Sequence, residues 1–434
     1  MLDVLPAKRL ILATQPVGVP MAATLSEADG LLLAADVIAP ISLPRFDNSA
    51  MDGYAVCADD CLKPEAVLKL VGETWAGREA SPSVLPGTCV RIMTGARLPE
   101  GATAVVMKEN CRVDGDKVCV SSVVKLGENI RRAGEEIQGG TLALSKGTRL
   151  NAGAIGFLSG LGVAEVFTYP RPIVSLIVTG SELAPAGTKL TGSQIYESNS
   201  AALAIAIRET GAILRPPVIV PDEPEKIRQA IDAALNSSSH VLLCGGVSVG
   251  EHDHNKRLLG EAGVQTVFWK IAQKPGKPLY FGERRGVLVF GLPGNPVSAL
   301  VCYYEYVRAA LLKFQNRFGD AEFLEGVGDG VEGQTLTARQ KKYFLPNVPA
   351  FLTETLKKKP GLTHFVRAKA FVEGRTLRVS PVDAQGSHMM GGFARANAIL
   401  VFPKQSEKLE EGTLVNIHML PGEAIYDGDA LFFW

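Results

Sequence analysis

The stretch from Pro44 to Val56, PRFDNSAMDGYAV, places two aspartates, an asparagine and a serine directly before a short strand-like run. One interpretation is structural, because Asp-Asn-Ser and Asp-Gly are turn sequences whose side chains bond to their own backbone. The other is a loop that presents carboxylates to a cation or a polar ligand. The segment alone leaves both interpretations open, so the rest of the chain has to distinguish them.

Two further segments follow apolar runs and combine glycines with acidic side chains. The first, 179–183 (TGSEL), carries Glu182, and the second, 245–254 (GGVSVGEHDH), opens a predicted helix. Glycines let the backbone approach a ligand closely, and N–H groups at a helix start suit a phosphate. Asp253 could bind magnesium, whereas the flanking histidines fit an ordinary polar helix start better than a zinc site. The second segment matches neither GxGxxG nor the Walker A loop, so a dinucleotide or P-loop site has no specific support.

Two more segments offer positive charge or free backbone amides. Residues 270–278 (KIAQKPGKP) contain three lysines, two of which precede prolines that hold the lysine backbone extended. Fixed lysines at a strand end could bind an oxyanion, although a charge run is usually a solvated surface. Residues 291–296 (GLPGNP) place Asn295 as an N-cap before Pro296, and the Pro-Gly turn leaves backbone amides for an anion. Together the four segments predict a pocket for a phosphate-bearing ligand, with carboxylates for a divalent metal and lysines for a second anion.

The elements that would position these segments alternate strand and helix from residue 172 to 318. Apolar strands that alternate with helices predict a doubly wound parallel sheet covered on both faces, an αβα domain. Ligands of such sheets bind beyond the carboxyl ends of the strands, where the four segments lie. The predicted strands are 173–178, 218–220, 240–244, 264–269 and 287–290, and the predicted helices are 199–210, 224–235, 254–262 and 296–313.

The rest of the chain predicts helical segments and two β-rich modules. Residues 26–37 are helix-like with Ser26 as N-cap, and residues 149–166 are expected to be helix-compatible and to pack against them. Short apolar segments between Gly and Pro turns indicate a β-rich domain in between and a β-barrel-like module after residue 318. The predicted domains are 1–42 with 138–171 (helical and linking), 43–137 (β-rich), 172–318 (αβα) and 319–434 (β-barrel-like).

The composition is that of a folded, multidomain protein. The chain has 434 residues, 46% of them apolar and 21% charged, and its 45 basic side chains balance 45 acidic ones. That balance gives no reason to expect a nucleic-acid or anionic-membrane partner. The sequence has no signal-peptide pattern and no apolar run of membrane-spanning length, so we expect a soluble cytoplasmic protein. The seven cysteines form no CxxC pair, which argues against a zinc site or disulfide framework, and Cys244 is expected to be a buried hydrophobe.

Taken together, the motifs resemble those of the molybdopterin molybdenumtransferases, the family of bacterial MoeA and the E domain of gephyrin. The resemblance implies a central domain similar to MogA. It also implies insertion of molybdate into adenylylated molybdopterin (molybdopterin-AMP), with release of AMP and formation of the molybdenum cofactor, assisted by Mg²⁺. Seven blocks in the right order carry the resemblance: FDNSAMDGYAV (46–56), RIMTGARLPEGATAVVMKE (91–109), NIRRAGEEI (129–137), IVTGSEL (177–183), GGVSVGEHD (245–253), KIAQKPGKP (270–278) and GLPGNPVSA (291–299).

The resemblance also implies site residues and partners. Family members are homodimers with the active site between subunits, so Asp52 is expected to complete the other subunit's site, while Asp47 and Asn48 remain turn formers. A transient contact with the molybdopterin adenylyltransferase is expected as well. The implied catalytic residues are Asp52, Thr94, Glu136, Glu182, Lys270, Lys274 and Lys277; the metal ligands are Asp52, Glu182, Asp222 and Asp253; and the cofactor-binding residues are Gly245, Gly246, Ser248, Gly250, Pro293, Gly294, Asn295, Arg367 and Ser387.

Three positions depart from the family pattern. Glu136 stands where aspartate is usual, His254 where tyrosine is common, and Leu31 where arginine is usual. None of these changes removes a carboxylate or a lysine, so the enzymatic interpretation is kept. Three alternatives stay open: a non-catalytic molybdopterin-binding scaffold, a tungstate-inserting homologue, and an enzyme of the preceding adenylylation step.

Overall fold

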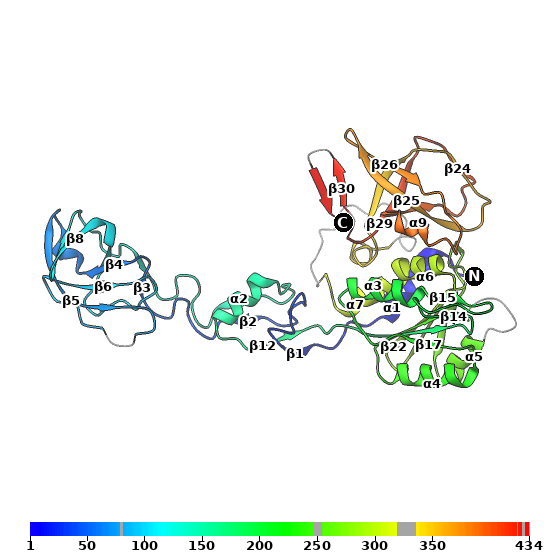
Figure 1. Cartoon of the computed structure of the whole chain (residues 1–434), viewed down its shortest axis with the longest axis horizontal. Coiled ribbons are helices and arrows are strands. Elements are labelled where there is room, and N and C mark those ends of the chain that lie inside the picture. Colours follow the sequence, from blue (N-terminus) through cyan, green and yellow to red (C-terminus); the bar gives the residue numbers. More distant parts are fainter. Residues whose placement is uncertain (79–80, 247–253, 319–335, 423, 428–429, 434) are drawn as a thin grey trace. The chain divides into compact units, whose positions relative to one another are not determined.

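The computed structural model describes residues 1–434 except 79–80, 247–253, 319–335, 423, 428–429 and 434. The chain divides into two compact units (Figure 1). The first contains Met1–Met21, Gly30–Leu32 and Thr168–Trp434, and the second contains Ala22–Asp29 and Leu33–Phe167. The chain therefore leaves the first unit after residue 21, contributes residues 30–32 to it, and returns to it after residue 167.

The centre of the first unit is a seven-stranded sheet in the order β16-β13-β18-β22-β21-β19, with β17 also pairing along β13. Four of its parallel strands, β13, β17, β18 and β22, are those expected from their apolar sequences, whereas the fifth, β16, was not predicted. The remaining two, β21 and β19, run antiparallel at one edge. The strands are β13 (Ile173–Thr179), β16 (Ile213–Leu214), β17 (Val218–Val220), β18 (His240–Cys244), β19 (Gln265–Trp269), β21 (Tyr280–Arg284) and β22 (Val287–Leu292).

The antiparallel edge corrects the expectation of a wholly parallel sheet. Strand β21 was missed by the sequence pattern, and it joins β22 through a two-residue turn. Both turn residues, Arg285 and Gly286, have positive φ, at 50° and 84°. Turns of this kind match the twist of a tight hairpin, and therefore the chain reverses into β22.

Helices cover both faces of this sheet, as the alternating pattern predicts (Figure 1). In β18, Leu242 and Cys244 join the core beneath one helical layer, whereas Val241 and Leu243 join the core beneath the other. One layer comprises α1 (Val4–Thr14), α3 (Asn199–Glu209), α6 (Pro296–Cys302), the π-helix η3 (Tyr303–Val307) and α7 (Arg308–Phe314), and the other comprises α4 (Pro224–Leu235) and α5 (His254–Glu261). Within the described residues, no helix is both long and apolar enough to cross a membrane.

The C-terminal part of the first unit is a small closed barrel, as expected. The strands follow the order β25-β26-β23-β29-β27, and pairing of β25 with β27 closes the ring. Strand β20 (Gln273–Lys274), from the lysine segment, adds to β25 in parallel. The barrel strands are β23 (Asn347–Leu352), β25 (Thr363–Glu373), β26 (Thr376–Pro381), β27 (Ala398–Phe402) and β29 (Leu414–Met419). The shorter elements of this unit are β14 (Leu183–Ala184), β15 (Ile195–Tyr196), α8 (Ala338–Lys341), β24 (Leu356–Lys357), α9 (Gly391–Ala394), β28 (Lys408–Leu409), β30 (Ala424–Asp427) and β31 (Ala430–Phe433).

The second unit contains the predicted β-rich domain, a six-stranded sheet in the order β7-β4-β6-β5-β9-β8. The strands are β4 (Gly53–Val56), β5 (Ala66–Thr74), β6 (Thr88–Ile92), β7 (Ala104–Met107), β8 (Cys111–Asp114) and β9 (Lys117–Val120). The shorter elements are β1 (Met21–Thr24), β2 (Val37–Ile38), β3 (Asn48–Ser49), η1 (Ala58–Cys61), η2 (Lys108–Asn110), β10 (Ile130–Arg131), β11 (Leu142–Leu144), α2 (Ala152–Gly160) and β12 (Glu165–Thr168).

The predicted helix at 26–37 is wrong. The Leu33 and Ala34 N–H groups donate to the carbonyls of Thr148 and Phe167, at 3.0 and 2.8 Å, and not to residues one turn earlier. Long-range partners for the backbone therefore override a sequence of good helix formers. The expected packing against 149–166 is confirmed, because Leu33 shares a core with Leu158 of α2.

A buried charge network joins three elements of the first unit. Glu305 of η3 accepts from Lys8 Nζ of α1 at 2.6 Å and lies 2.7 Å from His418 Nδ1 of β29. Burial alone would raise the pKa of Glu305, but His418 and Lys8 more than offset burial and hold that pKa at about 2. The carboxylate therefore stays charged inside the unit and ties the N-terminal helix and the barrel to the αβα domain.

We expect Glu305→Gln to lower the free energy of unfolding by about 3–5 kcal/mol, because it leaves Lys8 buried without its counter-charge. The folded-state pKa lies below the ordinary value of 4.5, so this stabilisation is present above about pH 4.5 and is lost as pH falls toward 2. Urea unfolding followed from about pH 7 to 3 should therefore show a steeper loss in wild type than in the variant.

Glu225→Gln is the matched control, since Glu225 forms an exposed pair with Arg228 within α4. It should change stability by less than about 1 kcal/mol. Equal effects of the two substitutions would contradict the role given to the buried network.

Candidate functional site

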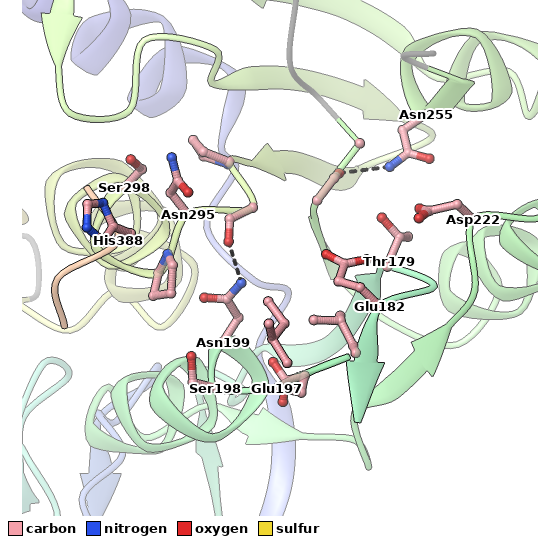
Figure 2. A pocket seen from close by; sticks show the side chains of 18 of the residues that line it. Thr179, Glu182, Glu197, Ser198, Asn199, Asp222, Asn255, Asn295, Ser298 and His388 are labelled. Atoms are coloured by element: carbon pink, nitrogen blue, oxygen red, sulfur yellow. Dashed lines mark hydrogen bonds between the residues drawn. The ribbon is translucent and has the colours of Figure 1, made fainter. Parts of the chain in front are cut away.

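A pocket of about 1050 Å³ lies in the first unit, at the carboxyl ends of the parallel strands (Figure 2). All four segments singled out in the sequence contribute to its lining: Glu182 follows β13, Gly245 and Gly246 follow β18, Gly294 follows β22, and Lys277 comes from the lysine segment. Asp222, after β17, also lines it. The expectation that these loops converge is therefore confirmed.

Carboxylates occupy one side of the pocket, where Figure 2 places Glu182 near Asp222. Asp222 Oδ2 accepts from the Ser181 N–H at 3.0 Å, and the Asp222 N–H donates to Ser181 Oγ at 3.0 Å. This reciprocal pair fixes the loop after β13 against the end of β17. The Glu182 side chain is exposed to the pocket, so both carboxylates have oxygens available for a cation or for a ligand hydroxyl.

The first two glycines of the loop after β18 have no room for side chains. Gly245 has φ of 100°, and a Cβ there would lie 2.6 Å from the Thr179 carbonyl oxygen. At Gly246 a Cβ would lie 2.3 Å from Nδ2 of Asn255, which donates to the Gly245 carbonyl at 2.8 Å. The predicted residues Ser248, Gly250 and Asp253 lie outside the described residues, and so does most of the rest of this loop.

Amide and hydroxyl groups occupy the other side of the pocket. Asn199 Nδ2 donates to the Gly294 carbonyl at 2.7 Å. Asn295 stands at the predicted N-cap position before Pro296, but its side chain does not cap the helix. Its Nδ2 donates instead to Ser387 Oγ at 3.1 Å, and Ser387 belongs to the barrel. The barrel therefore reaches the edge of the pocket.

The three predicted lysines occupy different places. Lys277 lines the pocket next to Pro278. Lys270 has φ of 71°, and its ammonium lies 3.8 Å from the ring centroid of Trp269. Lys274 is exposed in β20, opposite His364 of the barrel. The sequence grouped the three, whereas the fold brings Lys277 to the pocket lining.

Arg367, predicted to bind the cofactor, is buried in β25 with 1% of its surface exposed. Its guanidinium donates to the carbonyl oxygens of Ala384 and Gly386. The Gln385 side chain bonds in turn to the Arg367 N–H at 3.2 Å and carbonyl at 2.8 Å. Arg367 thus holds the loop that carries Ser387, and direct contact with a ligand stays a prediction.

In the second unit, two predicted residues meet. Asp52 Oδ1 accepts from both the N–H and the hydroxyl of Thr94, at 2.8 and 2.7 Å. These bonds lower the pKa of Asp52, the Thr94 N–H having the larger effect, so the carboxylate is ionised at neutral pH. Glu136 is exposed on the same unit, and its N–H donates to the Leu43 carbonyl at 3.0 Å.

The expectation that Asp47 is a local turn former is wrong. Its carboxylate accepts from Arg132 Nη1 at 2.6 Å and from the Ala133 N–H at 2.8 Å, about 85 residues along the chain. Asp47 therefore joins the sequence blocks 46–56 and 129–137.

Cys244 is fully buried as expected, and burial raises the pKa of its thiol to about 12.

Sequence reasoning missed several lining residues. Glu197 accepts from the Ser200 N–H at 2.7 Å at the start of α3, a Glu-x-x-Ser spacing that could have indicated a helix start. The others carry no local signal, because distant parts of the chain bring them to the pocket. The missed lining residues with polar side chains include Glu197, Ser198, Asn199, Asn255, Ser298 and His388.

Comparison with protein-family models gives three matches along the chain. Residues 2–162 match the MoeA N-terminal region (domain I and II). Residues 175–313 match a probable molybdopterin binding domain. Residues 349–420 match the MoeA C-terminal region (domain IV).

Whole-chain comparisons agree with these matches. The chain is 35% identical over 396 residues to a molybdopterin molybdenumtransferase of Haemophilus influenzae, covering 91% of this chain and 92% of that protein. It is also 35% identical over 414 residues to molybdopterin molybdenumtransferase 2 of Mycobacterium tuberculosis, covering 93% and 95%. The crystal structure of the molybdopterin biosynthesis protein MoeA from Pyrococcus horikoshii aligns with a TM-score of 0.74 at 27% identity, covering 98% of this chain and 100% of that one. The chain therefore belongs to the molybdopterin molybdenumtransferase family and is a transferase of molybdenum cofactor biosynthesis.

Proposed function

We propose that this transferase inserts molybdate into adenylylated molybdopterin and releases AMP, giving the molybdenum cofactor. The observation that carries the proposal is the pocket, where Glu182 and Asp222 face a side lined by Asn295 and Ser298, and where Lys277 is also part of the lining. Cleavage of a phosphoanhydride depends on charge neutralisation and positioning more than on a strong nucleophile. A pocket with donors on one side and carboxylates on the other meets that requirement.

Magnesium would be held by Glu182 and Asp222. The described residues contain no group of three or more His, Cys, Asp or Glu side chains placed to hold a metal. Mg²⁺, however, is commonly bound by one or two carboxylates together with water and substrate phosphates, so this pair fits. When bound, the ion neutralises charge on phosphate oxygens. Asp52 and Asp253 remain the other two predicted metal ligands.

We assign Asp52 and Thr94 to the same reaction, acting in a homodimer in which the Asp52 carboxylate of each subunit completes the pocket of the other. Thr94 donates two hydrogen bonds to Asp52, which fix the carboxylate and keep it ionised, and among the described residues no lysine or arginine forms an ion pair with it. An oriented, charged acceptor can hold a reacting hydroxyl. A cytoplasmic location and a transient contact with the molybdopterin adenylyltransferase belong to the same proposal.

We expect Asp52→Asn to reduce AMP release from adenylylated molybdopterin by roughly hundredfold or more while leaving pterin binding and dimerisation intact. The asparagine Oδ1 can still accept from Thr94, so the loss reports the missing charge. The measurement is AMP formed in the presence of molybdate and Mg²⁺.

Asp59→Asn, in an exposed aspartate of the same unit, is the control and should retain wild-type rates. A wild type that releases AMP no faster than buffer would refute the proposed reaction. An Asp52→Asn variant at full rate would instead favour a role for Asp52 outside the reaction.

We expect Asp222→Asn to raise the Mg²⁺ concentration needed for half-maximal AMP release by at least about tenfold. Asparagine can still accept from the Ser181 N–H, so the loop should keep its position. Glu223→Gln is the control, because Glu223 pairs with Lys226 on the surface. Equal Mg²⁺ requirements in all three proteins would remove Asp222 from the metal site.

Three other functions are distinguished by simple assays. A non-catalytic scaffold would bind the pterin but be indifferent to Asp52→Asn. An adenylylating enzyme would consume ATP with molybdopterin. A tungstate-inserting homologue would prefer tungstate when molybdate and tungstate compete at limiting concentration. For this chain we expect at most a small preference, because both anions are tetrahedral dianions of similar size.

A further inference from the structure

His388 is a pocket residue that the barrel supplies. It lines the pocket, and Figure 2 places its ring beside Asn295 and Ser298. The side chain is exposed, and among the described residues neither ring nitrogen has a protein hydrogen-bond partner. An imidazole always carries at least one N–H donor. His388 therefore has a donor that remains available to a bound molecule.

The backbone next to His388 is fixed against the αβα domain. The Val297 N–H of α6 donates to the Ser387 carbonyl at 3.2 Å. Asn295 Nδ2 donates to Ser387 Oγ at 3.1 Å. Two bonds on one residue hold the barrel loop at the start of α6, and His388 follows directly.

The loop is also held from behind. The buried Arg367 guanidinium bonds to the carbonyls of Ala384 and Gly386, and the Gln385 side chain donates to the carbonyls of Arg367 and Val382, at 2.8 and 2.7 Å. A buried arginine is costly to desolvate unless it is well bonded. These bonds order three consecutive loop residues, so the backbone that leads into His388 is fixed by its contacts with buried residues.

The chemistry of the two sides of the pocket indicates what His388 would bind. Glu182 and Asp222 occupy one side, while Asn295 and Ser298 share the other with His388; Glu197 and Lys277 also line the pocket. A tetrahedral oxyanion is repelled by carboxylates and attracted by N–H and O–H donors and an ammonium group. The donor side is therefore where such an anion would lie.

We propose that His388 is an anion-binding residue of this pocket, whose imidazole N–H donates to an oxygen of a tetrahedral oxyanion. The inference rests on the proposed function, which supplies two such groups: the phosphate of adenylylated molybdopterin and molybdate itself. Both groups present negatively charged oxygens that can accept a hydrogen bond from the imidazole. Measuring the KM for each substrate shows which of the two His388 binds.

The experiment compares wild type with His388→Leu, His388→Gln and Met389→Leu in the AMP-release assay, varying adenylylated molybdopterin and molybdate in turn. His388→Leu removes the donor, and we expect about a tenfold higher KM for one of the two substrates, the size expected for one hydrogen bond to a charged group. His388→Gln keeps a side-chain N–H and should stay within about threefold of wild type. Met389 is the exposed neighbour, and its variant should match wild type.

Thermal unfolding separates a structural effect from a binding effect. We expect the melting temperatures of all four proteins to agree, and any variant that melts lower is assayed well below its transition, where it is folded. A rise in KM for adenylylated molybdopterin assigns the phosphate, and a rise for molybdate assigns that anion. If His388→Leu leaves both KM values within twofold of wild type, or if His388→Gln is as impaired as His388→Leu, the proposal is overturned. A wild type that releases no AMP refutes the proposed function instead.

Discussion

The ionised carboxylate of Glu305 is the constraint on which the first unit depends. It is buried where three elements meet, and its charge is tolerable only because Lys8 and His418 approach from two different elements. An apolar contact would permit small shifts between the barrel and the αβα domain, whereas a buried charge pair has a narrow geometry. The barrel is therefore held in the register that lets residues 384–388 reach the start of α6.

The pocket depends on this position of the barrel against the αβα domain and on close backbone packing at the edge of the sheet. Parallel strands deliver their loops to one edge, but the loops form a pocket only because Gly245 and Gly246 permit close approach to Thr179 and Asn255. Asp222 then locks the neighbouring loop through Ser181. The carboxylate side is thus built within the αβα domain alone, whereas the donor side requires the barrel.

The sequence predicted what local pattern controls. Apolar strands such as 173–178 and 240–244, and the convergence of their loops, follow from alternation with helices, and the structure confirms them. Strand 280–284 was missed because YFGER is not continuously apolar. The helix at 26–37 was wrong because its backbone bonds to residues more than 100 positions away. Asp47 was misjudged for the same reason, since its partner Arg132 lies in another block. The amino acids around a residue do not indicate which distant residues it will bond to in the folded chain.

The candidate site shows the same division between local and distant information. Carboxylates and glycines on βα loops were found because each follows a strand. Asn199, Asn255 and His388 were missed because each reaches the pocket through a contact distant in the sequence. Asn199 donates to the Gly294 carbonyl and Asn255 to the Gly245 carbonyl, whereas His388 is brought to the pocket by the barrel loop at α6. The donor side of the pocket is therefore formed mostly by contacts between residues that are distant in the sequence. It is also the side to which we assign the oxyanion, so differences in oxyanion choice among relatives should be sought in the barrel loop and its contacts with α6, and not in the carboxylate loops.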